Sequence, residues 1–107
     1  MSIITHVLKN DSYEQLCVEI RYLVASARAT DGELVSISLD HSDENISKAL
    51  AAVVKILRAM KKEGKIDFFA SGEDFALGSA EASYLNNKFP DIIRDFNLSG
   101  AAYIIKL

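Results

Sequence analysis

The segment from Asp43 to Lys65 constrains the fold more than any other stretch, because it carries almost every signal of an amphipathic helix. Acidic residues at its start and lysines near its end complement the helix dipole. Ser42 or Asp43 can cap the first turn, and Gly64 is placed to end the helix in a left-handed conformation. We therefore predict one long helix that buries a single wide face. The apolar residues of this face recur at steps of three and four: Ile46, Ala49, Leu50, Val53, Ile56, Leu57 and Met60.

Apolar segments stand directly before and after this helix, at Leu34–Leu39 and Ile66–Ala70, and they predict a strand–helix–strand unit. The first segment alternates strictly between aliphatic residues and a face that carries Ser36 and Ser38. Such alternation favours a strand that is well covered on one side only, near an edge of the sheet. The second segment is apolar on both faces, which favours a more central position.

The remaining segments continue the alternation of strands and helices. Ser12 and Gln15 form a capping-box pattern ahead of a helix that we expect to end near Arg28. Pro90 disfavours helical geometry at the residue before it, so we expect two short helices there rather than one. The other predicted elements are strands at Ile3–Leu8 and Ala101–Leu107 and helices at Ala80–Lys88 and Pro90–Phe96.

These elements predict a single small α/β domain over residues 1–107, with the order strand, helix, strand, helix, strand, helical region, strand. We expect a four-stranded, mostly parallel sheet packed with helices, and the alternative is a mixed sheet whose first or last strand is antiparallel. The sequence does not decide the conformation of residues 71–79, which could form a loop or a capped turn. We expect Phe75 and Leu77 to fold back onto the core and Tyr84 to point inward.

Composition excludes several classes of protein. A net charge of -3 gives no support for a nucleic-acid partner. No segment has the roughly 20 apolar residues that cross a membrane, and the first residues lack the pattern of a signal peptide. Cys17 is the only cysteine, so no internal disulfide forms, which fits a reducing cytoplasm. We therefore expect a cytoplasmic protein without nucleic-acid or membrane partners.

Acidic turns offer one candidate site. In a parallel sheet, ligands favour the carboxyl ends of the strands, where the turns after the first three strands would open. Carboxylates at this density can hold Mg²⁺, and a histidine among them can act as a general base. The competing interpretation is that these residues are helix caps and solvated turns. The candidate catalytic residues are Asp40, His41, Glu73 and Asp74, beside the further acids Asp11 and Asp43.

Ligand binding has a second set of candidates at the same turns: Ser42, Ser71 and Gly72. A helix amino end at Ser42 can receive an anion, but the turn has no glycine and its acids repel one. The Ser71–Gly72 turn is better placed, though still acidic. No metal-ligand spacing and no cofactor motif is present, so we expect neither a bound metal nor a cofactor. His6 is interpreted as a satisfied sheet residue and Cys17 as a small apolar side chain.

Tyr103 and Ile105 suggest an interface. They belong to the apolar terminal strand, and such a strand at a sheet edge invites pairing with another chain. Tyr84 and Phe75 would add to the same patch. An ordinary internal strand is the equally plausible interpretation of this segment.

One layout resembles a known family. A strand ends at Asp40, a polar turn contains Ser42, a long helix follows, and then come Gly64 and an apolar strand. This is similar to sulfate-transporter/anti-sigma-antagonist domains, and the resemblance implies a small α/β regulatory module. Independently of this resemblance, the small size, the absence of a catalytic constellation and the apolar terminal strand favour a non-enzymatic module that acts through protein–protein interaction or self-association. The alternative is a small-ligand or divalent-metal-dependent enzyme that uses the acidic turns.

Overall fold

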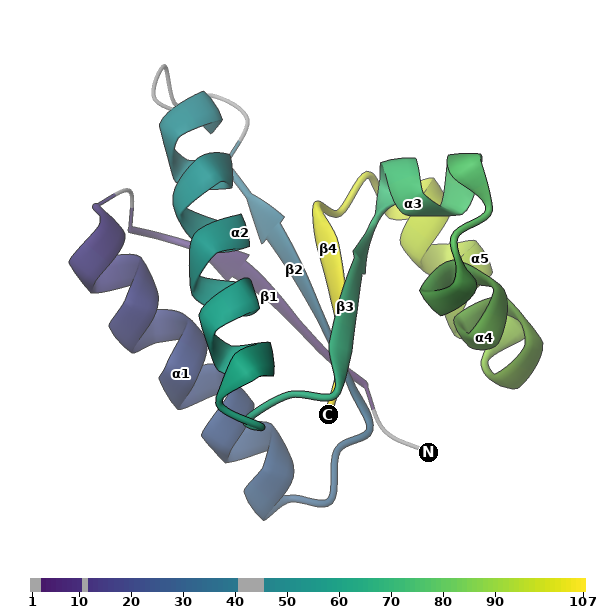
Figure 1. Cartoon of the computed structure of the whole chain (residues 1–107), viewed down its shortest axis with the longest axis horizontal. Coiled ribbons are helices and arrows are strands. Elements are labelled where there is room, and N and C mark those ends of the chain that lie inside the picture. The colour runs from purple at the N-terminus through teal and green to yellow at the C-terminus, as the bar shows by residue number, and fades with distance from the viewer. Residues whose placement is uncertain (1–2, 11, 41–45) are drawn as a thin grey trace.

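Two layers of helices enclose a twisted sheet (Figure 1). The computed structural model describes residues 3–10, 12–40 and 46–107 of the chain. The sheet strands are β1 (Ile3–Leu8), β2 (Leu34–Leu39), β3 (Phe68–Ser71) and β4 (Tyr103–Lys106). The helices are α1 (Tyr13–Ala29), α2 (Ile46–Lys62), α3 (Gly72–Leu77), α4 (Ala80–Lys88) and α5 (Pro90–Ser99). The predicted class and element order are therefore confirmed.

The strand order is β1-β2-β4-β3, so the last strand of the chain lies between the second and the third. β1 and β2 pair in parallel, whereas β4 is antiparallel to both of its neighbours. It follows that β1, β2 and β3 all point the same way. The sheet is the mixed alternative, with the last strand as the antiparallel one.

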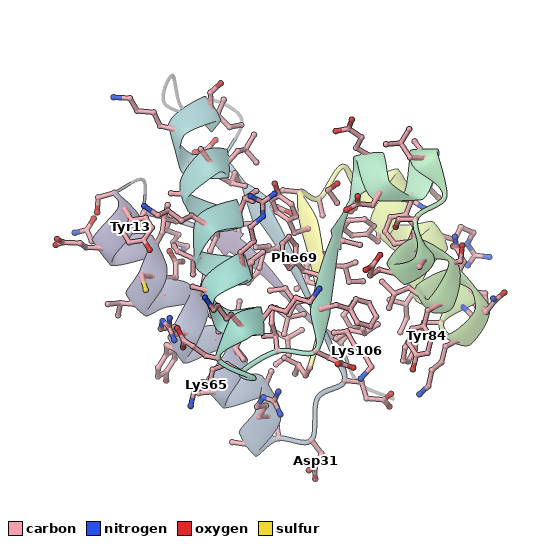
Figure 2. All side chains as sticks on the ribbon, in the orientation of Figure 1. Tyr13, Asp31, Lys65, Phe69, Tyr84 and Lys106 are labelled. Carbon is pink, nitrogen blue, oxygen red and sulfur yellow. The ribbon has the colours of Figure 1, made fainter. Side chains whose placement is uncertain are left out.

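Two predicted strand positions are wrong. β2 is internal rather than near an edge, and Ser36 is buried there beside β4. β3 is an edge strand rather than a central one. Its apolar residues on both faces have another cause, because both helical layers reach it. Ala70 packs against the α4–α5 layer, while Phe69 lies on the side of β3 that faces α2 (Figure 2).

The sheet separates two hydrophobic clusters. On one face, α1 and α2 pack over β1, β2 and β4, and their contacts include Leu16, Ile56 and Ile105. On the other face, α4 and α5 pack over β3, β4 and the start of β2, where Leu85 meets Ile104. The second layer is displaced toward β3, so no β1 side chain among the described residues belongs to its cluster. One face of β1 is therefore left without a helix.

Local signals explain the ends of α1 and α2. The Ser12 side chain accepts a hydrogen bond from the Gln15 backbone, as the capping pattern predicts. Gly64 has a φ of +75°, which favours glycine and ends the turn after α2. The predicted cap of α2 at residues 42 and 43 lies outside the described residues. Arg21 and Glu63 form a two-pronged ion pair at 2.8 and 3.0 Å that joins the two helices.

The segment 71–79 contains a capped helix, α3, which the sequence left undecided. Phe75 does fold onto the second cluster, with its ring 5.5 Å from that of Phe96. Leu77 is instead 77% exposed, so its inward placement is wrong. Tyr84 lies at the surface of α4 (Figure 2) and is 42% exposed, but its ring packs edge-on against Phe68 at 5.7 Å, so it is only partly inward. The break at Pro90 is confirmed. Across the described ranges, no helix has the length and apolar character to cross a membrane.

Candidate functional site

The turns after β1, β2 and β3 begin at one edge of the sheet, because these three strands point the same way. β1 and β3 are the two outer strands, three inter-strand spacings or about 14 Å apart. Ligands of one metal ion lie within about 2.6 Å of it, so side chains of the first and third turns would have to reach across this distance, and a site shared by the acidic turns stays a prediction. His41 and Ser42, like Asp11 and Asp43, fall in the part of the chain that the structure does not describe.

Asp40 lines a cavity of about 320 Å³ at the carboxyl ends of β1 and β2. Lys9 and Asn10 contribute polar groups to it, and Ile46 and Ala49 of α2 close its apolar side. Ligand crevices in such sheets form where neighbouring crossovers leave on opposite faces. Here α1 and α2 lie on the same face, so this crevice lacks that feature.

Ser71, Gly72, Glu73 and Asp74 form the start of α3. The Asp74 carboxylate accepts hydrogen bonds from the Ser71 backbone at 2.7 Å and the Ser71 hydroxyl at 3.1 Å. The Ser71 hydroxyl in turn accepts from the Asp74 backbone, which completes a capping box. These groups stabilise a six-residue helix, as the competing interpretation expects. Their catalytic and ligand-binding roles stay predictions.

Tyr103 and Ile105 lie on β4, which is paired on both sides. Ile105 is fully buried in the first cluster, and the Tyr103 ring packs edge-on against Phe69 at 6.0 Å. Burial raises the pKa of the Tyr103 hydroxyl, and the negative charge of Asp74 raises it further. The internal-strand interpretation of this segment is therefore confirmed. The free edge from which an interface was inferred lies elsewhere, at β1.

Glu19 is a polar centre that sequence reasoning missed. Its carboxylate lies 2.7 Å from His6 Nε2 and 2.9 Å from Asn10 Nδ2, and it also accepts from the Lys9 backbone at 3.2 Å. Burial acts to raise the pKa of Glu19, but these hydrogen bonds outweigh it and hold the pKa below its ordinary value. His6 is thus the satisfied sheet residue that the sequence predicts. The network fixes the β1–α1 turn against the helix.

Clusters of metal-ligating side chains and the environment of Cys17 were two further places for a site. Within the ranges 3–10, 12–40 and 46–107, no three His, Cys, Asp or Glu side chains gather to hold a metal ion. Cys17 is partly buried on α1, and its Sγ accepts a hydrogen bond from Arg21 Nε at 3.2 Å. Because Arg21 also binds Glu63, this contact belongs to the joint between α1 and α2.

The free edge of β1 is the most exposed apolar element of the sheet. β1 is six residues long and carries no proline, lysine, arginine or acid, and among the described strands it pairs only with β2. Its outward face presents Ile3, Thr5 and Val7. Ile3 is 36% exposed and Val7 is 48% exposed. Sequence reasoning identified the alternation of this strand but not its position at an edge.

The comparisons with known proteins add no identity to this geometry. No protein-family model, curated protein or solved structure matches the chain. The likeness to sulfate-transporter/anti-sigma-antagonist domains therefore stays a likeness of layout.

Proposed function

We propose that the protein is a non-enzymatic interaction module, which binds a polypeptide strand along the free edge of β1. The observation that carries this proposal is the unprotected character of that edge. An edge strand presents a row of unpaired N–H and C=O groups, and proteins usually blunt it with lysine, proline, a bulge or very short length. β1 has none of these features. Strand addition at such an edge is a common mode of peptide recognition.

The opposite edge of the sheet shows the contrast. β3 has only four residues, the charged residues Lys65 and Asp67 precede it, and α3 begins directly after Ser71. Length, charge and a covering helix are the usual protections of an edge. The two edges of one sheet thus differ in the property that decides whether a second chain can pair. The module would act in the cytoplasm, and its single cysteine, Cys17, supports that setting.

A small-ligand function at the carboxyl ends of β1 and β2 is the second candidate, and the cavity beside Asp40 favours it. The enzyme hypothesis needed Asp40 and Asp74 to act together, but β4 lies between their strands and Asp74 caps α3. Thermal unfolding with and without Mg²⁺ or inorganic phosphate tests this candidate. A saturable rise in the unfolding temperature that Asp40→Asn abolishes would support it over strand addition.

A labelled peptide of the β1 sequence, Ile3 to Lys9, tests the strand-binding proposal. We expect its fluorescence anisotropy to rise with added protein, because an edge strand accepts a strand of alternating apolar residues. Two control peptides carry backbone N-methyl groups at alternate residues. Since a strand donates to its neighbour from every second N–H only, one control should lose binding and the other should retain it.

The protein variants complete the test. Val7→Lys places a charge on the exposed face of β1 and should weaken binding at least tenfold. Leu98→Lys, at an exposed apolar residue of α5, is the matched control and should bind as the parent does. Absence of binding up to about 1 mM by protein that light scattering shows to be monomeric, or equal loss with both N-methylated peptides, would overturn the proposal.

A further inference from the structure

We infer that the strand bound by β1 is β1 of a second copy, joined in an antiparallel pair centred on Thr5, with the two α1 helices in contact through Tyr22. This inference rests on the proposed function and names its partner. It combines three observations: the free edge, the exposed apolar face of β1, and an exposed apolar flank of α1. Each of them is incomplete as an interface without the other two.

The symmetry of the pair fixes its register. A closed dimer has a two-fold axis, and an axis perpendicular to the sheet pairs β1 with its copy in antiparallel sense while keeping each face on its own side. Directly opposed residues of an antiparallel pair share a face, so the two-fold axis places one residue opposite its own copy. With Thr5 in that position, Ile3 faces Val7 of the partner subunit. This register pairs the exposed apolar residues with each other and places threonine against threonine, a favourable cross-strand pair.

The orientation of α1 brings its exposed residues to the same side. Glu19 binds His6, so this flank of the helix faces β1, whereas Arg21 binds Glu63, the residue after α2, on the other flank. At 100° per residue, Tyr22 lies about 60° around the helix from Glu19. Tyr22 and Val18 are 74% and 71% exposed. They line a shallow, mainly apolar groove together with Asn10, Glu14, Gln15 and Glu19.

The height of Tyr22 matches the proposed axis. α1 runs back against the direction of β1, because it connects two parallel strands. Tyr22 is one helical step of three residues, about 4.5 Å, beyond Glu19, and this distance corresponds to between one and two strand residues. The Glu19 carboxylate contacts His6 and, farther along the chain, Lys9 and Asn10, so Tyr22, one step toward the other end of the strand, lies beside the middle of β1, where Thr5 is. The two-fold axis therefore brings the two copies of Tyr22 together above the joined strands.

The buried area that a stable dimer needs favours an interface that includes both the paired strands and the exposed flank of α1. A stable dimer buries about 800 Å² on each partner. A paired strand of six residues is about 20 Å long and does not supply that area through its backbone alone. The α1 flank on one face of the sheet and Ile3 with Val7 on the other add apolar contacts on both sides of the joined strands. Tyrosine at the centre of such a patch is typical of interfaces.

Cross-linking tests the register directly. In a Cys17→Ser background, Thr5→Cys places two thiols on the axis, where Cα atoms about 5 Å apart allow a disulfide. We expect a covalent dimer under mild oxidation. Leu98→Cys in the same background, on α5, should stay monomeric under denaturing electrophoresis. Thr5 is on the exposed face of β1, so the substitution leaves the core intact.

Light scattering and sedimentation equilibrium of the full chain provide the second measurement. The parent should be a dimer, and Tyr22→Glu should raise its dissociation constant about 10–100-fold. Leu98→Lys should leave the constant unchanged. A parent that is monomeric at about 100 µM would overturn this inference, as would a dimer that cross-links at Leu98→Cys and not at Thr5→Cys. Binding of the β1 peptide by a monomeric parent would still support the proposed function, so the two failures are distinguishable.

Discussion

Replacing Glu19 should cost much more stability than its position on a helix surface suggests. The carboxylate collects donors from His6, the Lys9 backbone and Asn10, and its side chain is only 14% exposed. Hydrogen bonds to a charged group contribute about 1.5–3 kcal/mol each, and Glu19→Gln keeps one neutral oxygen acceptor while removing the charge. We therefore expect Glu19→Gln to lower the free energy of unfolding by about 2 kcal/mol at pH 7.

The effect should depend on pH with a definite sign. The pKa of Glu19 in the folded chain lies below its ordinary value of 4.5. A carboxylate with a lowered folded pKa contributes stability that is present above the unfolded pKa and lost as the pH falls through the folded pKa. The difference between parent and Glu19→Gln should thus be full at pH 7 and should shrink below pH 4.5, since the glutamine does not titrate.

Urea denaturation followed by circular dichroism measures this difference, at one fixed protein concentration because dimerisation would add to the stability. A loss of about 2 kcal/mol shifts the urea midpoint by about 1–2 M. Glu14→Gln is the control: it removes an exposed acid from the same helix and should change stability by less than about 0.5 kcal/mol in physiological salt. If the Glu19→Gln loss is no larger than the control, or persists unchanged at pH 3, the charged network is not its cause.

Three further predictions concern the stability of the fold. Gly64→Ala should destabilise by about 1 kcal/mol because φ is +75°, whereas Gly72→Ala, where an added Cβ meets nothing within 4 Å, should be neutral or stabilising in thermal unfolding. Ile105→Ala should cost about 2–5 kcal/mol in chemical denaturation, while Leu98→Ala should be nearly neutral because that side chain is exposed. Glu63→Gln should lower the melting temperature slightly, and 1 M salt should abolish the difference from the parent because the Arg21 and Glu63 side chains are 37% and 43% exposed.

Patterns spread over a few neighbouring residues predicted the elements well. The alternation of Leu34–Leu39, the capping residue Ser12 and Pro90 each report on local backbone geometry. The interactions behind these signals join residues that lie within one or two helical turns or within one strand. The element order of the chain follows directly from them.

Strand order was harder to predict because it depends on contacts between distant segments. The serines of β2 suggested an edge, but Ser36 is buried by the insertion of β4 beside it. The aromatic residues of β3 suggested the centre, yet Phe68 and Phe69 contact different helical layers. Exposure along a strand reports how many helices cover it as much as where it lies in the sheet. A single sequence does not separate these two causes.

The position of β4 determines which strand ends are neighbours and which strand is left at an edge. By entering between β2 and β3, it separates the end of β3 from the ends of β1 and β2. The same insertion encloses Tyr103 and Ile105 and leaves β1 as the only long edge of the sheet in the described part of the chain. The residues of β1 were visible in the sequence as an ordinary amphipathic strand. They became candidates for an interface because a segment almost a hundred residues later takes the central place. The edge available for association is thus a consequence of long-range topology, and perturbing β4 packing should affect association through β1 only by way of stability.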